Sequence, residues 1–228
     1  FNFESFSLQS NRQALYEKYA QLLFSKQKLY PCSCSRKKLF EENPINADGE
    51  VIYSGHCLKN PINKNSDFAL RFKTPDKTIT WEDLLLGKFE ENPKNQCGDF
   101  TIKDRISQWT YQFAVCVDDL EENIGLVVRG EDLRNSTARQ IALLETLGKK
   151  TPPLYLHHPL LTEKSGEKLS KRQHSKSLRA ELEQGLSIED LLGLVCYETH
   201  SIPKKAPLTL NEAIYSIQKT YFSCFLKK

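Results

Sequence analysis

The stretch Leu126-Val127-Val128-Arg129-Gly130-Glu131-Asp132 decides the fold class of this chain. Its first three residues form a short apolar run rich in valine, which is typical of a central strand in a parallel sheet. The run ends at four charged or small residues, and open α/β sheets bind their ligands beyond the carboxyl ends of such strands. The stretch therefore predicts a strand that carries Arg129 to a binding site.

Helical segments flank this strand in the sequence. Trp109 to Val117 is a dense apolar and aromatic segment whose length favours a buried helix. Ser136-Thr137 can start another helix, which Gly148 ends. Asn11 to Lys26 carries apolar residues at three- and four-residue spacing, and we expect Ser10 to cap that helix. Helices that alternate with short apolar strands predict an α/β core.

Further short strands are expected where apolar residues alternate with polar ones or cluster briefly. These segments are Phe68–Phe72, Ile79–Trp81, Phe100–Ile102 and Leu154–Leu156. Between them, Glu90 to Gly98 is predicted to be a polar loop. Periodic leucines near the C-terminal end predict a few short helices.

Composition bounds the function. The chain has 228 residues, of which 39% are hydrophobic, as in a folded globular protein. The 32 Lys and Arg residues exceed the 29 Asp and Glu residues by only three, so a local patch must hold any polyanion. No apolar run approaches the roughly 18 residues of a membrane span, which excludes a membrane-spanning function. The seven cysteines are scattered, which favours a reducing compartment, and we expect a cytoplasmic protein without a membrane partner.

Two cysteine-bearing segments suggest a metal site. They are Cys32-Ser33-Cys34 and Tyr53-Ser54-Gly55-His56-Cys57. Thiolates bind zinc tightly, and a metal that links the two segments would order the polar stretch from Glu41 to Pro61. Three thiolates need a fourth ligand, which is either Tyr53 or His56. The alternative is that these are loop cysteines brought into this spacing by chance.

A lysine-bearing loop suggests phosphate chemistry. Gly166-Glu167-Lys168-Leu169-Ser170-Lys171-Arg172 places two lysines around a small hydroxyl residue, and such cations can offset charge that grows during phosphoryl or nucleotidyl transfer. A mobile loop of this kind can act only when nucleotide is bound. The alternative is a solvated basic turn.

A third candidate site pairs Tyr111 with Arg129. Arginine at a strand end can bind a carboxylate through two parallel hydrogen bonds, and a nearby phenol can fix an amino or carboxylate group. The alternative is a structural Arg–Asp ion pair beside a core tyrosine. His157 and His158 are not expected to share one metal, because adjacent side chains of an extended segment point to opposite faces.

Taken together, five motifs occur in the order found in one family. They are Cys32-Ser-Cys34 with Tyr53-Ser-Gly-His-Cys57, Trp109-Thr-Tyr-Gln-Phe-Ala-Val-Cys-Val-Asp-Asp119, Val127-Val-Arg-Gly-Glu-Asp-Leu133, Ser136-Thr-Ala-Arg-Gln140 and Glu167-Lys-Leu-Ser-Lys-Arg172. From about Gln9 to Arg179 the chain resembles the class I glutamyl-tRNA synthetases, and most closely their short branch, the glutamyl-Q tRNA(Asp) synthetases.

The resemblance implies an α/β fold of the class I aminoacyl-tRNA synthetase type. It implies a Rossmann-type catalytic core that is incomplete at the N-terminus, a zinc-binding insertion and a small helical C-terminal part. The implied divisions are a helix of the core in 1–28, the insertion in 29–66, the rest of the core with the Lys-Leu-Ser-Lys loop in 67–175, and the helical region in 176–228.

The resemblance also implies an activity. Such an enzyme activates L-glutamate with ATP and Mg²⁺ as glutamyl-adenylate and transfers it to queuosine in the anticodon loop of tRNA(Asp), acting as a monomer. Lys168, Ser170 and Lys171 then correspond to the catalytic signature, in which Lys168 and Lys171 bind ATP. Tyr111 and Arg129 become the residues that bind glutamate. The implied ligands of one structural Zn²⁺ are Cys32, Cys34, Tyr53 and Cys57.

Two departures from the family pattern bear on these expectations. The family's N-terminal section with its ATP signature has no counterpart before Phe1, so we expect the chain to be a fragment. Ser107-Gln108 stands where relatives commonly carry an Asp-Gly turn. Two other readings stay open: the catalytic portion of an ordinary glutamyl-tRNA synthetase, and a noncatalytic, zinc-stabilised tRNA-binding module.

Overall fold

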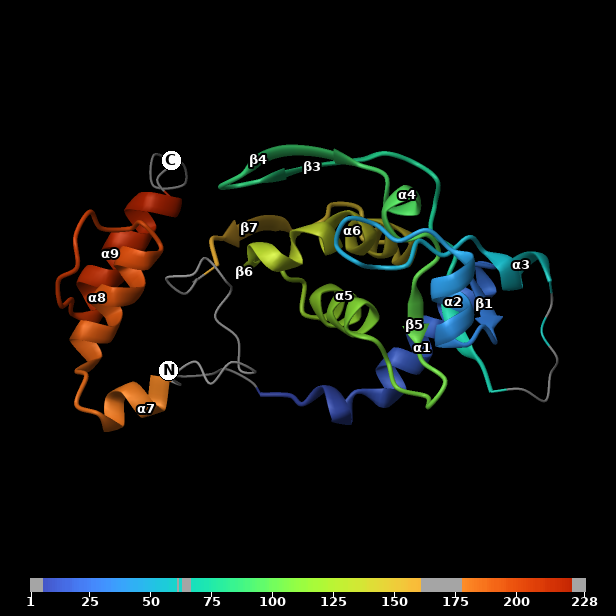
Figure 1. The fold of residues 1–228 in the computed structure, drawn as a ribbon, viewed down its shortest axis with the longest axis horizontal. Coiled ribbons are helices and arrows are strands. Elements are labelled where there is room, and N and C mark those ends of the chain that lie inside the picture. The colour runs from blue at the N-terminus through green and yellow to red at the C-terminus, as the bar shows by residue number, and fades with distance from the viewer. Residues whose placement is uncertain (1–5, 61, 63–66, 161–177, 223–228) are drawn as a thin grey trace. The chain divides into compact units, whose positions relative to one another are not determined.

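The computed structural model describes residues 6–60, 62, 67–160 and 178–222 (Figure 1). The described residues form two compact units, whose bounds along the sequence also span the residues outside the described ranges. Unit 1 comprises Phe1–Asp83, Gly87–Val127 and Asn135–Tyr155. Unit 2 comprises Leu84–Leu86, Val128–Arg134 and Leu156–Lys228.

Unit 1 contains a three-stranded antiparallel sheet in the order β1-β2-β5. Its strands are β1 (Leu29–Cys32), β2 (Ala69–Phe72) and β5 (Thr101–Lys103). Three helices pack with this sheet, α1 (Gln13–Ser25), α5 (Tyr111–Glu121) and α6 (Thr137–Leu147). Their apolar side chains join Phe72 and Ile102 in the largest buried cluster of the described residues. Burial of this apolar surface is the main force that holds unit 1 together.

The second sheet has four strands in the order β4-β3-β7-β6. They are β3 (Ile79–Asp83), β4 (Gly87–Glu91), β6 (Leu126–Gly130) and β7 (Leu154–His158). Strands β3 and β4 form an antiparallel hairpin, and β3 runs parallel to β7 (Figure 1). Trp81 of β3 stacks on Phe89 of β4 with their ring centroids 4.6 Å apart.

Helix α6 contributes to two apolar clusters of unit 1. Leu143, Leu144 and Leu147 belong to the cluster beside the three-stranded sheet, whereas Ile141 packs with Trp81 in the cluster beside β3. The helix is therefore buried on most of its circumference, including the polar residues Arg139 and Gln140, which is more than the single apolar face of its sequence predicts. Its end at Gly148, which has φ 109°, confirms the predicted stop signal.

The remaining elements are short or lie in unit 2. They are η1 (Gln9–Asn11), α2 (Arg36–Glu42), α3 (His56–Lys59), α4 (Pro93–Cys97), η2 (Glu131–Ser136), α7 (Leu178–Glu183), α8 (Ile188–Glu198) and α9 (Leu210–Tyr221). Helices α8 and α9 pack against each other (Figure 1). Among the described residues, none of these helices combines the length and the apolar character that crossing a bilayer requires.

The α/β class, the strands expected at residues 68–72, 79–81, 100–102 and 154–156, and the helix expected from Trp109 are confirmed in type and place. Two local expectations were wrong. Ser10 does not cap the first long helix, because a 3₁₀ turn precedes it and Arg12 occupies the cap position. Glu90 to Gly98 is not a loop: it contains the end of β4 and helix α4, which Asn92 caps by accepting a hydrogen bond from the Lys94 N–H.

The predicted central position of Leu126–Val128 was also wrong for the described sheet. Strand β6 stands at the end of the strand order, and Val128 is 53% exposed. Only Val127 packs, partly buried, against the cluster beside β3, so a run of β-branched residues does not by itself distinguish a strand at the end of a sheet from a central one. The sequence pattern therefore identified the strand but not its neighbours.

Candidate functional site

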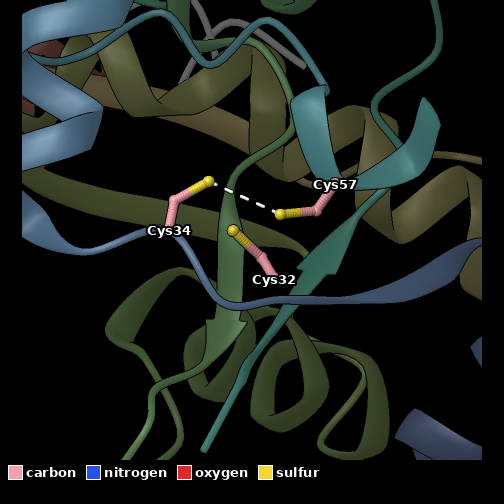
Figure 2. A group of neighbouring side chains, drawn as sticks. All are labelled: Cys32, Cys34 and Cys57. Carbon is pink, nitrogen blue, oxygen red and sulfur yellow. Dashed lines mark hydrogen bonds between the residues drawn. The ribbon is translucent and has the colours of Figure 1, made fainter. Parts of the chain in front are cut away.

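Three cysteine sulfur atoms meet in unit 1. The Sγ atoms of Cys32, Cys34 and Cys57 all lie within 4.8 Å of one another, and all three residues are buried (Figure 2). Cys34 Sγ and Cys57 Sγ are 3.4 Å apart. The first two cysteines come from the end of β1 and the segment after it, and Cys57 comes from α3. The two segments that the sequence analysis paired are thus neighbours in the fold.

The side chain of Tyr53 reaches the same cluster. Its Oη atom lies 3.4 Å from Cys32 Sγ and 3.6 Å from Cys34 Sγ, and it accepts a hydrogen bond of 3.0 Å from the Cys57 N–H. Tyr53 is 1% exposed. His56 does not join the cluster, because its Nε2 atom lies 3.4 Å from Lys38 Nζ instead. Of the two candidates for a fourth ligand, the geometry favours Tyr53.

Close backbone packing holds Tyr53 in place. Its N–H donates to the Cys97 carbonyl, and Gly98 forms a bridge with it. A Cβ atom at Gly98 would lie 2.1 Å from the Tyr53 carbonyl oxygen, so only glycine fits there. Gly98 also has φ 64°, a conformation that favours glycine. The Arg71 guanidinium stacks over the Tyr53 ring, with its Cζ 3.8 Å from the ring centroid.

The thiols differ in acidity. Burial raises the pKa of the Cys34 thiol to about 11. Burial opposes ionisation of Cys57 as well, but hydrogen bonds from Tyr53 and the Ser33 backbone outweigh it and lower the pKa of the Cys57 thiol to about 7. Burial also raises the pKa of the Tyr53 phenol above its usual range, and its hydrogen bond with Cys32 adds to this. Cys57 is thus more ready to ionise than Cys34.

The donor set fits a tetrahedral Zn²⁺ ion. With Zn–S bonds of about 2.3 Å and a Zn–O bond of about 2.0 Å, tetrahedral geometry sets S···S separations near 3.8 Å and S···O separations near 3.5 Å. The distances from Tyr53 Oη to Cys32 Sγ and Cys34 Sγ, 3.4 and 3.6 Å, match the second value, the Cys34–Cys57 sulfur separation of 3.4 Å is slightly shorter than the first, and the other sulfur separations are within 4.8 Å. The arrangement can therefore hold a structural metal with three thiolates and one phenol oxygen.

Strand β6 carries Arg129, which belongs to unit 2. Arg129 is 9% exposed, and its Nε donates a 2.9 Å hydrogen bond to Nε2 of His157, which is fully buried at the end of β7. This bond requires the Nε2 atom to be without a proton. This hydrogen bond fixes the orientation of the Arg129 guanidinium. After Arg129, strand β6 ends at Gly130 and the chain enters η2.

Tyr111 is the first residue of α5 in unit 1 and is 49% exposed. The residue before it, Thr110, donates its hydroxyl to the Thr101 carbonyl at 2.8 Å and thereby anchors the helix start to β5. Next to Tyr111, Gln112 links two residues around the start of α6: its Nε2 donates to Ser136 Oγ, and its Oε1 accepts from Gln140 Nε2, both at 2.8 Å. The residues on both sides of Tyr111 are therefore anchored, which fixes the position of its backbone.

Lys168, Ser170 and Lys171 lie outside the described residues. Their proposed relation to Arg129 and Tyr111 stays a prediction.

Comparison with known proteins identifies the family. The sequence profile described as "tRNA synthetases class I (E and Q), catalytic domain" matches residues 1–202. The chain belongs to this family. The resemblance inferred from the five motifs is thereby confirmed.

Several curated relatives of this class I synthetase domain share a name. "Glutamyl-Q tRNA(Asp) synthetase" of Neisseria meningitidis serogroup C (strain 053442) is 39% identical over 173 residues, which cover 75% of this chain and 58% of the relative. The proteins of the same name from Verminephrobacter eiseniae and Geobacter sulfurreducens are each 38% identical and cover 75% of this chain. The matches span 60% and 55% of those relatives, so this chain matches little more than half of their length.

Solved structures share the fold of the synthetase domain. The glutamate-tRNA synthetase of Elizabethkingia anophelis superposes with a TM-score of 0.66 at 22% identity, covering 92% of this chain and 54% of that one. A glutamate tRNA ligase of Elizabethkingia meningosepticum superposes with a TM-score of 0.67 at 22% identity, covering 94% and 54%.

Sequence reasoning missed two residues of this synthetase domain. Arg71 was placed among the polar positions of a half-buried strand, but it is 7% exposed, because the segment with Tyr53 covers the face of β2 opposite Phe72. His157 was considered only as a metal ligand and was not connected with Arg129. Each contact joins residues 18 or more positions apart, and a single sequence carries no signal for such contacts.

Proposed function

We propose that this chain is part of an ATP-dependent ligase that activates glutamate and transfers it to queuosine in the anticodon loop of tRNA(Asp). The observation that carries the proposal is the identity of 37–39% over 75% of this chain with relatives named glutamyl-Q tRNA(Asp) synthetase. The partners of the whole protein are then ATP, L-glutamate and tRNA(Asp).

Adenylate formation sets simple chemical demands. A carboxylate oxygen of glutamate attacks the α-phosphorus of ATP, the bond to the β-phosphate oxygen breaks, and pyrophosphate leaves. No protein nucleophile is needed, only aligned substrates and cations that offset the phosphate charge. Mg²⁺ would accompany the nucleotide and share that charge when bound.

The chain offers a residue for each demand. Arg129, oriented by His157, would pair with a carboxylate of glutamate, and the phenol of Tyr111 would contact the same substrate. Lys168 and Lys171 would bind the triphosphate, with Ser170 between them. A structural Zn²⁺ on Cys32, Cys34, Tyr53 and Cys57 would hold the polar segment between β1 and β2.

The test of activation is ATP–pyrophosphate exchange by the full-length protein with glutamate and without tRNA. We expect exchange with glutamate and none with glutamine or aspartate. The family resemblance implies that an ordinary glutamyl-tRNA synthetase needs its tRNA for this step, so exchange that appears only with tRNA would favour that enzyme. The absence of exchange with every amino acid, with and without tRNA, would contradict the ligase and favour a tRNA-binding module.

Two matched variants separate glutamate recognition from phosphate chemistry in this assay. Arg129→Lys keeps the charge but loses the planar fork, so we expect the KM for glutamate to rise about tenfold or more. Lys171→Gln removes a cation from the leaving pyrophosphate, so kcat should fall while the KM for glutamate changes little.

The acceptor is tested with radiolabelled glutamate. Label should enter tRNA(Asp) that contains queuosine and should not enter the unmodified transcript. Label that enters both forms equally, in an ester that survives removal of queuosine, would exclude the modified base as acceptor.

A further inference from the structure

A cavity of about 360 Å³ opens beside the thiol cluster in unit 1. Residues from all three strands of the antiparallel sheet line it, among them Cys32 of β1, and Cys34 lines it as well. Three arginines, Arg36, Arg71 and Arg105, also line it. The chain as a whole carries a formal charge of only +3, so three guanidinium groups around one cavity are a marked local concentration.

Carbonyl oxygens, not carboxylates, hold two of these arginines. Arg71 Nη1 donates to the Asp99 carbonyl at 2.7 Å, and Arg105 Nη2 donates to the Ser33 carbonyl. In residues 6–60, 62, 67–160 and 178–222, no carboxylate oxygen lies within 4.0 Å of a nitrogen of any of the three guanidinium groups. The carbonyls therefore orient the cations without neutralising them.

The carboxylate that does line the cavity is engaged elsewhere. Asp104 accepts hydrogen bonds through Oδ1 from the N–H groups of Ile106 and Gln108, at 3.0 and 2.8 Å. It acts as the acceptor of a tight turn. The Asp104 carboxylate thus binds the backbone of its own loop, and it forms no ion pair with the arginines that line the cavity.

Arg71 is the buried member of the group. It is only 7% exposed, and its Nε has no hydrogen-bond partner among the described residues. A buried guanidinium without a counter-charge is costly, and an anion in the cavity would offset that cost. Three thiolates around one Zn²⁺ would carry a net charge of −1 and Asp104 carries another, so the three arginines would still leave the cavity with a net positive charge of one.

The remaining lining defines the class of anion. The side chains of Leu39, Ala69 and Ile106 give the cavity an apolar part, and Ile106 is 77% exposed at its rim. A phosphate next to a flat, apolar base matches this combination of cations and apolar surface. Arg36 and Arg105 are exposed, so a long polymer can reach them without the protein opening.

We propose that this cavity binds one nucleotide of an RNA chain, with the backbone phosphate on Arg36, Arg71 and Arg105 and the base against Leu39 and Ile106. The inference rests on the proposed function, because it takes tRNA as the polyanion. It adds a specific RNA contact beside the thiol cluster, formed by side chains from α2, β2 and the turn after β5.

The test measures binding of the full-length protein to a tRNA(Asp) transcript at several salt concentrations. Arg36→Gln and Arg105→Gln should each weaken binding about three- to tenfold, and each should lower the slope of log K against log salt by about one. In the double variant the losses of affinity and the changes in slope should add. Lys88→Gln, an exposed position of β4 with the same charge change, should stay within twofold of the wild type.

Three readouts separate the possible outcomes. Unchanged zinc content and circular dichroism establish that Arg36→Gln and Arg105→Gln fold normally. Wild-type affinity and salt slope in the double variant would overturn the proposal. Loss of ATP–pyrophosphate exchange with unchanged RNA binding would assign the cavity to free nucleotide and would also overturn it. If RNA binding falls as expected but the wild type shows no exchange, the cavity stands and the ligase does not.

Discussion

The side chains of Tyr53 and His56 leave the chain three residues apart and meet different neighbours. The Tyr53 phenol lies among the thiols, whereas the His56 imidazole lies beside Lys38. Imidazole is the commoner zinc ligand, so residue type alone would favour the histidine. The position of the side chains favours Tyr53 instead, because Gly98 allows the backbone of Tyr53 to pack directly against the end of α4, and the Tyr53 phenol lies among the thiols.

A pair of variants tests this at the residue scale. Tyr53→Phe removes only the ligand oxygen, so the purified variant should retain clearly less zinc than the wild type in competition with a chelator. His56→Ala should retain about one zinc per chain, as the wild type is expected to. Elemental analysis measures both. Equal zinc retention in Tyr53→Phe and the wild type would exclude the phenol as a ligand.

At the scale of elements, what the sequence predicts depends on how local the cause is. Helix α6 was predictable, because its apolar residues and Gly148 are local signals. Strand β4 and helix α4 were not predicted, because Glu90 and its neighbours are polar, and β4 is held by the stacking of Phe89 on Trp81 across the hairpin. The spacing of the cysteines predicted that two segments meet, but the contacts of Arg71 and His157 arise only from tertiary packing.

The buried position of α6 leads to a stability prediction. Leu143 is completely buried in the larger cluster, so Leu143→Ala should lower the free energy of unfolding by about 2–5 kcal/mol through lost apolar burial and a cavity. Leu210→Ala is the matched control, because Leu210 on α9 is 57% exposed and should cost less than about 1 kcal/mol. Urea denaturation followed by circular dichroism measures both. Equal losses would contradict the central role assigned to α6.

At the scale of the whole molecule, the two units differ in what stabilises them. Unit 1 has apolar clusters but also a long polar segment between β1 and β2, which the thiol cluster anchors. Helices α8 and α9 of unit 2 pack through residues such as Cys196 and Ala213, and none of the proposed metal ligands belongs to that unit. Metal loss should therefore act on one unit.

Chelation tests this division of roles. Removing the metal should increase deuterium uptake in β1 and α3, because metal-binding free energy is also folding free energy for the segment it links. Uptake in α8 and α9 should not change. Hydrogen exchange with mass spectrometry measures both regions in the intact protein, and a Cys57→Ser variant should show no further change on chelation. An equal increase in all four elements would contradict the prediction.

The two tryptophans of the chain lie in two different apolar clusters of unit 1 and can serve there as separate fluorophores. Trp81 stacks on Phe89 beside β3, whereas Trp109 packs against Phe113 in the larger cluster with Lys103 Nζ 4.3 Å from its ring centroid. Because indole emission depends on polarity and nearby charge, the two side chains emit from different surroundings. Replacing either one with phenylalanine leaves a single tryptophan, so the unfolding of each of these two clusters can be followed separately by its fluorescence.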